Sequence, residues 1–336
     1  GLVGRLILQG KNDAGEDTTY ARIHAGIVDA SDGTEDGLLQ LASMLDGTVV
    51  SRMEMNATET VFNDGSKDLD FRVESDGNAN MLFVDAGNNR VLIGTNTPVT
   101  AFTTAAFQVS GTSNAPSTMS IGRFSDNANA PVLNFIKSRN ASIGGNTILG
   151  GGDNLGSILF NGNDGVDSAT SAVKILGEVD GTPGSNDMPG RLVFSTTADG
   201  SNSTSEVMRI DSSGNVGIGQ TSPGADLEIN RSGASTLRLT NAVNAQSAND
   251  IIGEIEFFSA DNSSPGDSVR ADITAINEDT SNNVALAFGT AANGGNVTER
   301  MRINANGRVH IGSSSALSVG SNMDFTIQGQ DGGAGA

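Results

Sequence analysis

Residues 208–219 read MRIDSSGNVGIG, and residues 301–312 read MRINANGRVHIG, so one short pattern occurs at two places in the chain. In each copy apolar side chains alternate with polar ones on both sides of a Gly-containing corner. Alternation with a period of two is typical of a strand with one buried face, and Gly or Asn at the corner accepts a positive φ at low steric cost. Both copies therefore predict a strand, a tight turn and a second strand. A looser copy runs from Met81 to Gly94.

Alternate glycines follow the corner in the first of these copies. Gly217 and Gly219 leave one face of the second strand without side chains. A bare face of this kind permits another stretch of backbone to approach closely.

This closing motif ends a longer unit of roughly 90–125 residues that occurs almost three times, and a repeat of this kind decides the fold. Each unit opens with a Gly and an alternating strand. A second strand is centred 17 or 18 residues later, and a third precedes a Met by 12 to 14 residues. The corresponding residues are Leu6, Ile23, Leu41 and Met53; Ile158, Ile175, Phe194 and Met208; and Ile255, Ile273, Phe288 and Met301.

After each closing motif a further alternating stretch is expected to open the next unit. The three openings are residues 107–109, 227–229 and 325–327. These openings predict that the chain is a segment of a longer array of units. Its parts are residues 1–98 (first unit, incomplete at its N-terminus and with an insertion or a second partial copy), 99–224 (second), 225–317 (third) and 318–336 (a truncated fourth).

A helix is not predicted anywhere. The best candidate, residues 38–45, aligns with strands in the other units, so we interpret it as a strand.

The composition argues against ordinary globular domains. Hydrophobic residues make up 36% of the 336 residues and aromatic ones 4%, with no Trp and one Tyr. Burial contributes about 25 cal/mol per Å² of apolar surface, against roughly 1–2 kcal/mol per residue for ordering the backbone. The periodic apolar spacing argues against disorder. We therefore expect an all-β chain that folds side by side with other copies, with apolar stripes pointing inward.

Charge and cysteine content limit the partners. The net charge of −20 lacks the basic footprint of a nucleic-acid-binding surface. It is explained by solubility and repulsion between assemblies, or by divalent-cation binding. No cysteine is present, which excludes disulfides and thiolate metal sites. No apolar run approaches the ~20 residues that cross a bilayer, so no membrane insertion is expected.

Residues 208–223 (MRIDSSGNVGIGQTSP) resemble the repeated motif of tail-fibre proteins of tailed bacteriophages, especially phages of marine cyanobacteria. Residues 190–196 (GRLVFST) and 198–200 (ADG) are similar as well. The resemblance implies the shaft region of an extracellular virion tail fibre: an elongated homotrimer of β-prism or β-sandwich-like beads on a threefold axis. In that family such repeats often precede a self-cleaving chaperone domain, and no residue here matches its Ser/Lys chemistry.

Candidate catalytic and ligand residues are few. His24 and His310 fall at different landmarks, and His310 alternates with Val309 and Ile311, so it is expected to face outward. Glycine-rich stretches such as residues 150–152 lack the Lys-Ser/Thr ending of a phosphate loop. Two acidic loops lack the spacing of a calcium loop and are interpreted as solvated. Their carboxylates are Asp29, Asp32, Glu35 and Asp36 in the first loop, and Asp164 and Asp167 in the second.

We accordingly predict no catalytic residue, no cofactor and no metal, and a protein that is not an enzyme. The leading hypothesis is a fibre shaft that positions a receptor-binding tip and aids attachment to the host, with other copies and other virion tail or fibre proteins as partners. The first alternative is a carbohydrate-binding adhesin segment, in a phage fibre or a prokaryotic surface filament, whose partner is a host surface glycan. The least supported is a polysaccharide depolymerase, which needs paired carboxylates in a groove.

Overall fold

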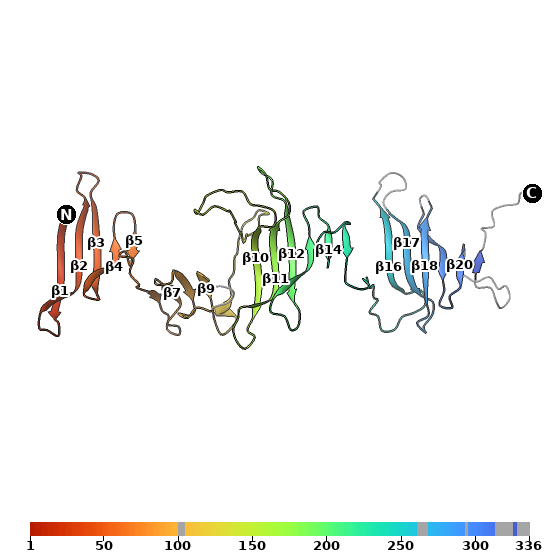
Figure 1. The fold of residues 1–336 in the computed structure, drawn as a ribbon, viewed down its shortest axis with the longest axis horizontal. Helices are drawn as coiled ribbons and strands as arrows, with labels where there is room; N and C mark the ends of the chain where they lie inside the picture. Colours follow the sequence, from red (N-terminus) through yellow and green to blue (C-terminus); the bar gives the residue numbers. More distant parts are fainter. Residues whose placement is uncertain (100–104, 261–267, 293–294, 313–324, 328–336) are drawn as a thin grey trace, which may run out of the picture. The chain divides into compact units, whose positions relative to one another are not determined.

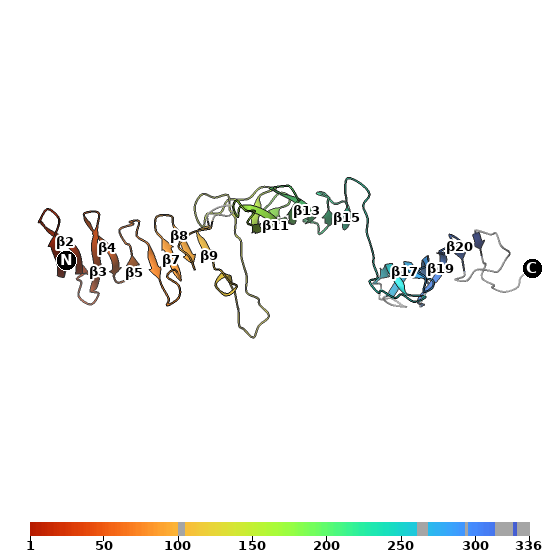
Figure 2. The ribbon, with the colours of Figure 1, turned by 90° about the horizontal axis from the view of Figure 1, so that it is seen from below.

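The computed structural model describes residues 1–99, 105–260, 268–292, 295–312 and 325–327. In this part of the chain the secondary structure is strands apart from one short 3-10 helix, η1 (Ala115–Ser117), which confirms the predicted all-β class. The chain divides into two compact units, Gly1–Ser232 and Gly233–Ala336. Within each unit the strands lie side by side in single-layered sheets (Figures 1 and 2).

Strands in the first unit follow one another across three sheets in the order of the sequence. The first sheet contains β1 (Leu2–Lys11), β2 (Asp17–Asp29), β3 (Asp36–Leu45), β4 (Thr48–Met55) and β5 (Thr60–Phe62). The second contains β6 (Phe71–Val73), β7 (Leu82–Asp85), β8 (Arg90–Ile93) and β9 (Phe107–Val109). The third contains β10 (Asn154–Gly162), β11 (Thr170–Val179), β12 (Gly190–Thr197), β13 (Thr204–Ile210), β14 (Val216–Ile218) and β15 (Leu227–Ile229).

One sheet with the same strand order forms the second unit. It contains β16 (Ile251–Ser259), β17 (Ser268–Asn277), β18 (Val284–Ala291), β19 (Val297–Ile303), β20 (Val309–Ile311) and β21 (Phe325–Ile327). Residues 38–45, the best helix candidate, lie in β3 as a strand, as predicted.

Both strong copies of the closing motif form the predicted antiparallel hairpins. Met208 pairs with Ile218 between β13 and β14, and Met301 pairs with Ile311 between β19 and β20. The looser copy forms the β7–β8 hairpin, which lies in a separate sheet with β6 and β9.

A β-bulge occurs at the same place in three sheets, where the third strand pairs with the fourth. In the third sheet Phe194 pairs with Met208 and Ser195 with Glu206, which leaves Val207 as the extra residue. The corresponding shifts lie between Leu41 and Ala42 in the first sheet and between Phe288 and Gly289 in the fourth. A bulge moves the residues on its two sides relative to the ordinary alternation.

The stretches that we expected to open new units form strands, and each is paired with the strand that precedes it in the chain. β9, β15 and β21 pair in parallel with the closing strand of the preceding sheet. The chain turns back after Gly219, and the Asn230 N–H then donates to the Ile218 carbonyl at 2.9 Å. Each of these strands therefore fills the hydrogen-bonding edge of the closing strand and becomes the last strand of that sheet. The unit boundaries stay a prediction, and of residues 318–336 only Phe325–Ile327 lie in the described part.

Gly219 makes this return possible, and the predicted close backbone approach at the alternate glycines is confirmed. A Cβ on Gly219 would lie 2.1 Å from the Asn230 carbonyl oxygen, and one on Gly217 would lie 2.2 Å from the Gln220 carbonyl oxygen. Gly219 also has a φ of +68°.

We predict that Gly219→Ala is more destabilising than Gly214→Ala. Gly214 has a φ of +87° with open space around its missing Cβ, so alanine there adds only left-handed strain of about 1–2 kcal/mol. Alanine at Gly219 adds comparable strain and also forces β15 away from β14. Urea unfolding of the two variants at equal chain concentration measures the difference, and equal losses would contradict the role of the close approach.

Candidate functional site: the apolar face of each repeat sheet

One face of the third sheet carries a row of apolar side chains in register from its first strand to its last. Residues directly opposite on paired strands point to the same face, so a chain of pairings defines the row. We call it the central row. Its members are Ile158, Ile175, Phe194, Met208, Ile218 and Ile229.

The same row occurs in the first and fourth sheets. In the first sheet it contains Leu6, Ile23, Leu41, Met53 and Phe62. In the fourth it contains Ile255, Ile273, Phe288, Met301 and Ile311. A shorter row, Phe71, Val84, Val91 and Phe107, crosses the second sheet. The ring of Phe62 lies 4.9 Å from that of Phe71, so the rows of the first two sheets meet.

A second row, which we call the flanking row, lies beside the central one on the same face. It begins with Gly4 and Ala25 in the first sheet, Gly156 and Gly177 in the third, and Gly253 and Ala275 in the fourth. Its next member is a leucine in each case, and then come larger apolar residues. In the third sheet the two adjacent glycines, Gly156 and Gly177, leave a hollow. This hollow has a volume of about 250 Å³ and is lined by Phe135, Leu155, Ile158 and Leu192 among others.

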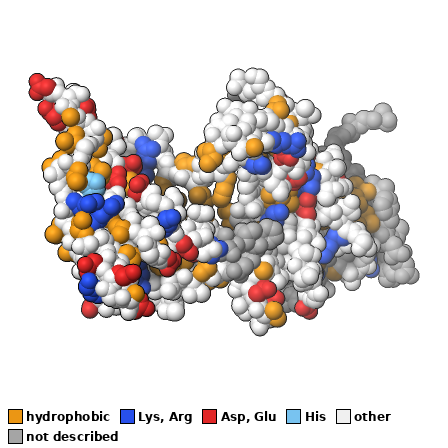
Figure 3. All heavy atoms as spheres, turned by 60° about the vertical axis from the view of Figure 1, so that its left-hand side comes forward, with side chains coloured by type: hydrophobic (Ala, Val, Ile, Leu, Met, Phe, Trp, Pro, Cys, Tyr) orange, Lys and Arg blue, Asp and Glu red, His pale blue; other side chains and the backbone are white. Residues whose placement is uncertain are grey.

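This apolar face is open in the single chain. Leu6, Ile158 and Ile255, equivalent residues of the central row, are 56%, 44% and 45% exposed. Figure 3 shows hydrophobic side chains lying at the surface among acidic and basic ones. A contiguous apolar surface of this kind marks an interaction site. The arrangement therefore supplies a binding face for other apolar surfaces and no reactive group.

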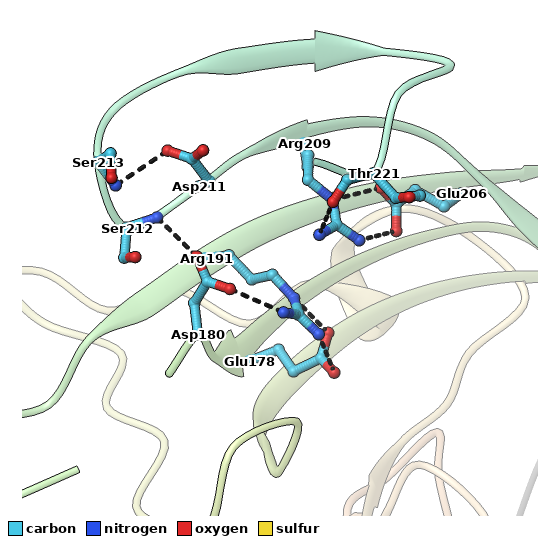
Figure 4. A network of polar contacts seen from close by, with 9 residues as sticks. All are labelled: Glu178, Asp180, Arg191, Glu206, Arg209, Asp211, Ser212, Ser213 and Thr221. Atoms are coloured by element: carbon cyan, nitrogen blue, oxygen red, sulfur yellow. Dashed lines mark hydrogen bonds and ion pairs between the residues drawn. The ribbon is translucent and has the colours of Figure 1, made fainter. Parts of the chain in front are cut away.

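Behind the apolar face, the reverse face of the third sheet carries a network of arginines and carboxylates (Figure 4). The Arg209 guanidinium donates to both oxygens of Glu206 at 2.6 and 2.7 Å and to the Thr221 carbonyl at 2.6 Å. Arg209 is 9% exposed, and its hydrogen bond to Glu206 raises its pKa. The sheet thus holds this charge in fixed geometry.

Arg191 and Asp180 connect this network to the closing turn. Arg191 pairs with Glu178 at 2.7 Å and Asp180 at 2.8 Å, and Asp180 also accepts the Ser212 N–H at 2.8 Å. The pKa of Asp180 is lowered, first by the Ser212 hydrogen bond and then by Arg191. The end of β11 is thereby tied to the β13–β14 turn.

The fourth sheet makes the same connection with one arginine instead of two. Arg302 binds both oxygens of Glu299 at 2.6 and 2.7 Å and reaches Glu278 at 3.4 Å. Glu278 accepts the Ala305 N–H at 3.0 Å, as Asp180 accepts that of Ser212. The fully buried Ala285 precedes Leu286 where Arg191 precedes Leu192, so the arginine of the closing motif serves both carboxylates. Every arginine of the network has a carboxylate partner, so the network is suited to a structural role.

Sequence reasoning missed this network, although a signal was present. Each closing-motif arginine has a glutamate three residues before it. In an unbroken strand two such residues point to opposite faces. The bulge brings Glu206 and Arg209 to the same face, and the bulge itself was not expected.

The prediction for His310 was wrong. It is 4% exposed, and its Nε2 lies 3.4 Å from Asn304 Nδ2. The alternation placed it correctly on the face opposite Ile311, in register with Arg302, but that reverse face is covered within the chain. His24 is half-buried in β2, where it lies opposite Arg5 and Gln40.

The two acidic loops form closed turns. The Asp29 carboxylate accepts the N–H and hydroxyl of Ser31 and the hydroxyl of Thr34, and the Ser31 hydroxyl is the main cause of its lowered pKa. Asp164 accepts the N–H groups of Val166 and Asp167. Across the described ranges no group of three or more His, Asp or Glu side chains is arranged to hold a metal ion.

A further ion pair fixes the start of the third sheet and gives a pH-dependent prediction. Arg139 donates to both carboxylate oxygens of Asp153 at 2.6 and 2.7 Å, and the Gly150 N–H donates at 2.8 Å. The Arg139 hydrogen bond, followed by that from Gly150, lowers the Asp153 pKa from 3.8 to about 2. Since the folded value is the lower one, this carboxylate adds stability above pH 3.8 that is lost as the pH falls toward 2.

We therefore expect Asp153→Asn to be less stable than the natural chain at neutral pH and equally stable near pH 2. Urea midpoints of the two chains measured across that interval provide the test. A difference that stays constant down to the lowest pH would mean that the carboxylate's charge is not responsible.

No family model and no curated protein matches the chain. Among solved structures, the carboxy-terminal domain of the bacteriophage T5 L-shaped tail fibre is similar at 12% identity and a TM-score of 0.30, covering 61% of this chain and 94% of that one. The same domain with its intramolecular chaperone domain is similar at 12% identity and a TM-score of 0.31, covering 65% and 69%. Both values are low, so the function is argued from the chain's own residues.

Within the described residues, no helix has the length and apolar character required to cross a bilayer.

Proposed function

We propose that this chain is a structural segment of a bacteriophage tail fibre, a homotrimeric shaft that holds a host-receptor-binding tip away from the virion. The observation that carries the proposal is the central row, which occupies the same register in three sheets and lies open in the single chain. A face that recurs with each repeat needs a partner that recurs with the same spacing. Other copies of this chain satisfy that condition.

Three copies follow from the resemblance of the closing motif to tail-fibre repeats. In such an assembly the central rows of three chains point toward the common axis and cover one another. Phe194, Met208 and their equivalents then supply the aromatic and sulfur-containing core that one chain of this composition lacks. The trimer supplies apolar burial that stabilises the fold.

The reverse face supports a mechanical role. Its arginine–carboxylate network joins the second strand of the sheet to the closing turn in two sheets. A tie of this kind resists local opening of the hairpin. The net charge of −20 keeps assembled fibres apart.

A glycan-binding role is the second candidate, and one exposed aromatic residue favours it. Tyr20 is 43% exposed near the β1–β2 turn, where Asn12, Asp13 and Asp17 add polar groups. Aromatic rings with polar neighbours are suited to sugar recognition. Binding of host polysaccharide by the chain, and its loss in Tyr20→Ala, would support this candidate. Release of reducing sugar ends would instead indicate a depolymerase.

Light scattering with sedimentation velocity tests the main proposal. A particle near three times 34.2 kDa with a high frictional ratio is expected. A compact monomer would overturn the proposal, because the open apolar face would then have no partner copy. Mass spectrometry of purified virions tests the phage origin, and detection of the chain in a cell envelope would favour a surface filament.

A further inference from the structure

Two short stretches upstream of β10 and β16 share a pattern of alternating apolar residues, and the proposed shaft gives these stretches no role. We call residues 132–136 and 236–240 the lead-in segments. Each has alternating apolar side chains, Leu133 and Phe135 in one and Leu237 and Leu239 in the other. Neither belongs to a strand of the single chain.

Each lead-in segment crosses the apolar face of the sheet that follows it. A Cβ on Gly156 would lie 2.6 Å from the Cβ of Phe135, and a Cβ on Gly253 would lie 2.7 Å from the Cβ of Leu239. These glycines open the flanking row. The missing side chains therefore admit the segments, and the segments lie over the sheet, in a second layer.

The backbone of both segments lacks partners in this second layer. No N–H or C=O group of residues 132–136 or 236–240 makes a hydrogen bond within the described part of the chain. Their alternate side chains are open as well, with Leu133 58% and Leu237 65% exposed. A stretch that lies over a sheet cannot pair with the edge of that same sheet. Its backbone groups point sideways, where they are available to a strand in the same layer.

A neighbouring copy supplies such a strand if the apolar faces pack together. The layer that covers the central row of one chain is then the sheet of the next chain. Among the described strands β10 pairs with β11 alone and β16 with β17 alone, so no strand lies beside the outer edge of β10 or beside that of β16 over residues 251–258. An extended stretch adding to a free edge is a recurrent mode of recognition.

We propose that each lead-in segment is an added strand of a neighbouring copy, with residues 132–136 pairing with the free edge of β10 and residues 236–240 with that of β16. This inference rests on the proposed self-assembly and assigns the segments that bridge the chains. The Arg139–Asp153 pair and the bond from Asn241 Nδ2 to the Ile251 carbonyl at 2.8 Å hold each segment at the level of the strand concerned. Because the segment and the edge recur together in both units, identical copies satisfy one another in a closed ring.

The experiment uses the full chain, which has no cysteine, with a benzoylphenylalanine photo-crosslinker in place of Leu133. Irradiation is expected to give covalent dimers on a denaturing gel, with the crosslink in the peptide that contains Asn154–Gly162. The matched control places the same probe at Val166, which is 88% exposed between β10 and β11, and is expected to give far fewer dimers. Light scattering on the same sample reports the assembly.

Hydrogen exchange and a proline variant give an independent readout. Amides of residues 132–136 are expected to exchange at least about tenfold more slowly than in an unstructured peptide. Asn134→Pro, which removes one donor, is expected to weaken the assembly, whereas Asn134→Ala leaves it unchanged. The inference would be overturned by a trimer in which crosslinks form only within one chain and residues 132–136 exchange rapidly. The proposed shaft function would not be affected by that result. A monomer would overturn the proposed function itself.

Discussion

Phe194→Asp is expected to weaken the assembly, so that chains with a mass near 34.2 kDa are present at concentrations where the natural chain forms only the larger particle. Phe194 lies in the middle of the central row, between Ile175 and Met208. In the assembly it faces the equivalent residues of the other copies. An unpaired carboxylate buried there costs several kcal/mol for each chain, so three of them outweigh the interface of one sheet.

The control adds the same charge elsewhere. Ser213→Asp places a carboxylate in the exposed β13–β14 turn, away from the apolar face, and is expected to keep the mass of the natural chain. Sedimentation velocity distinguishes the variants, and far-UV circular dichroism shows whether strands persist in the dissociated chain. A Phe194→Asp chain with the mass of the natural particle would show that the central row is not the interface.

Arg302→Ala is expected to destabilise the second unit by about 3 kcal/mol, the lower end of the range for breaking a buried ion pair. The arginine side chain is 15% exposed, and its removal leaves Glu299 and Glu278, 22% and 23% exposed, without their cation. Two carboxylates then share a half-buried site. Glu278 also loses the partner that aligns it with the Ala305 N–H.

Urea unfolding at fixed chain concentration measures the loss, since the stability of an assembly depends on concentration. Arg302→Lys should recover part of it, because an ammonium group cannot bind both oxygens of Glu299 in the same plane. Arg308→Ala removes an exposed arginine six residues along and is expected to change stability by less than about 0.5 kcal/mol. Equal effects of Arg302→Ala and Arg308→Ala would mean that the network contributes no stability.

The sequence was sufficient to predict the strands and the closing hairpins because apolar alternation and corner glycines are local signals. It also indicated the apolar face, since Ile158, Ile175 and Phe194 recur at matched spacing in other units. It could not place β15, whose parallel partner depends on a turn that brings Asn230 back to Ile218.

The burial and the ion pairs of the reverse face could be recognised only from the three-dimensional register of the strands. His310 alternates with apolar residues as a surface residue would, and only the covering of that face makes it buried. The bulge at Val207, which brings Glu206 to the side of Arg209, has no signature in the alternation. The lead-in segments were likewise not recognised, because they form no strand and their contacts with Gly156 and Gly253 appear only in three dimensions.

Strand order in every sheet follows the sequence, and this has a consequence for how the molecule is made. Each strand pairs only with its neighbours along the chain, so the contacts that form a sheet are close in sequence. Low contact order favours rapid formation, and a sheet can form as soon as its own residues have left the ribosome. Association with other chains is a separate and concentration-dependent event. We therefore expect strand pairing within each chain to precede association, and the sheets to become stable only when copies cover one another's apolar faces. The encounter of copies is then the slow step in maturation.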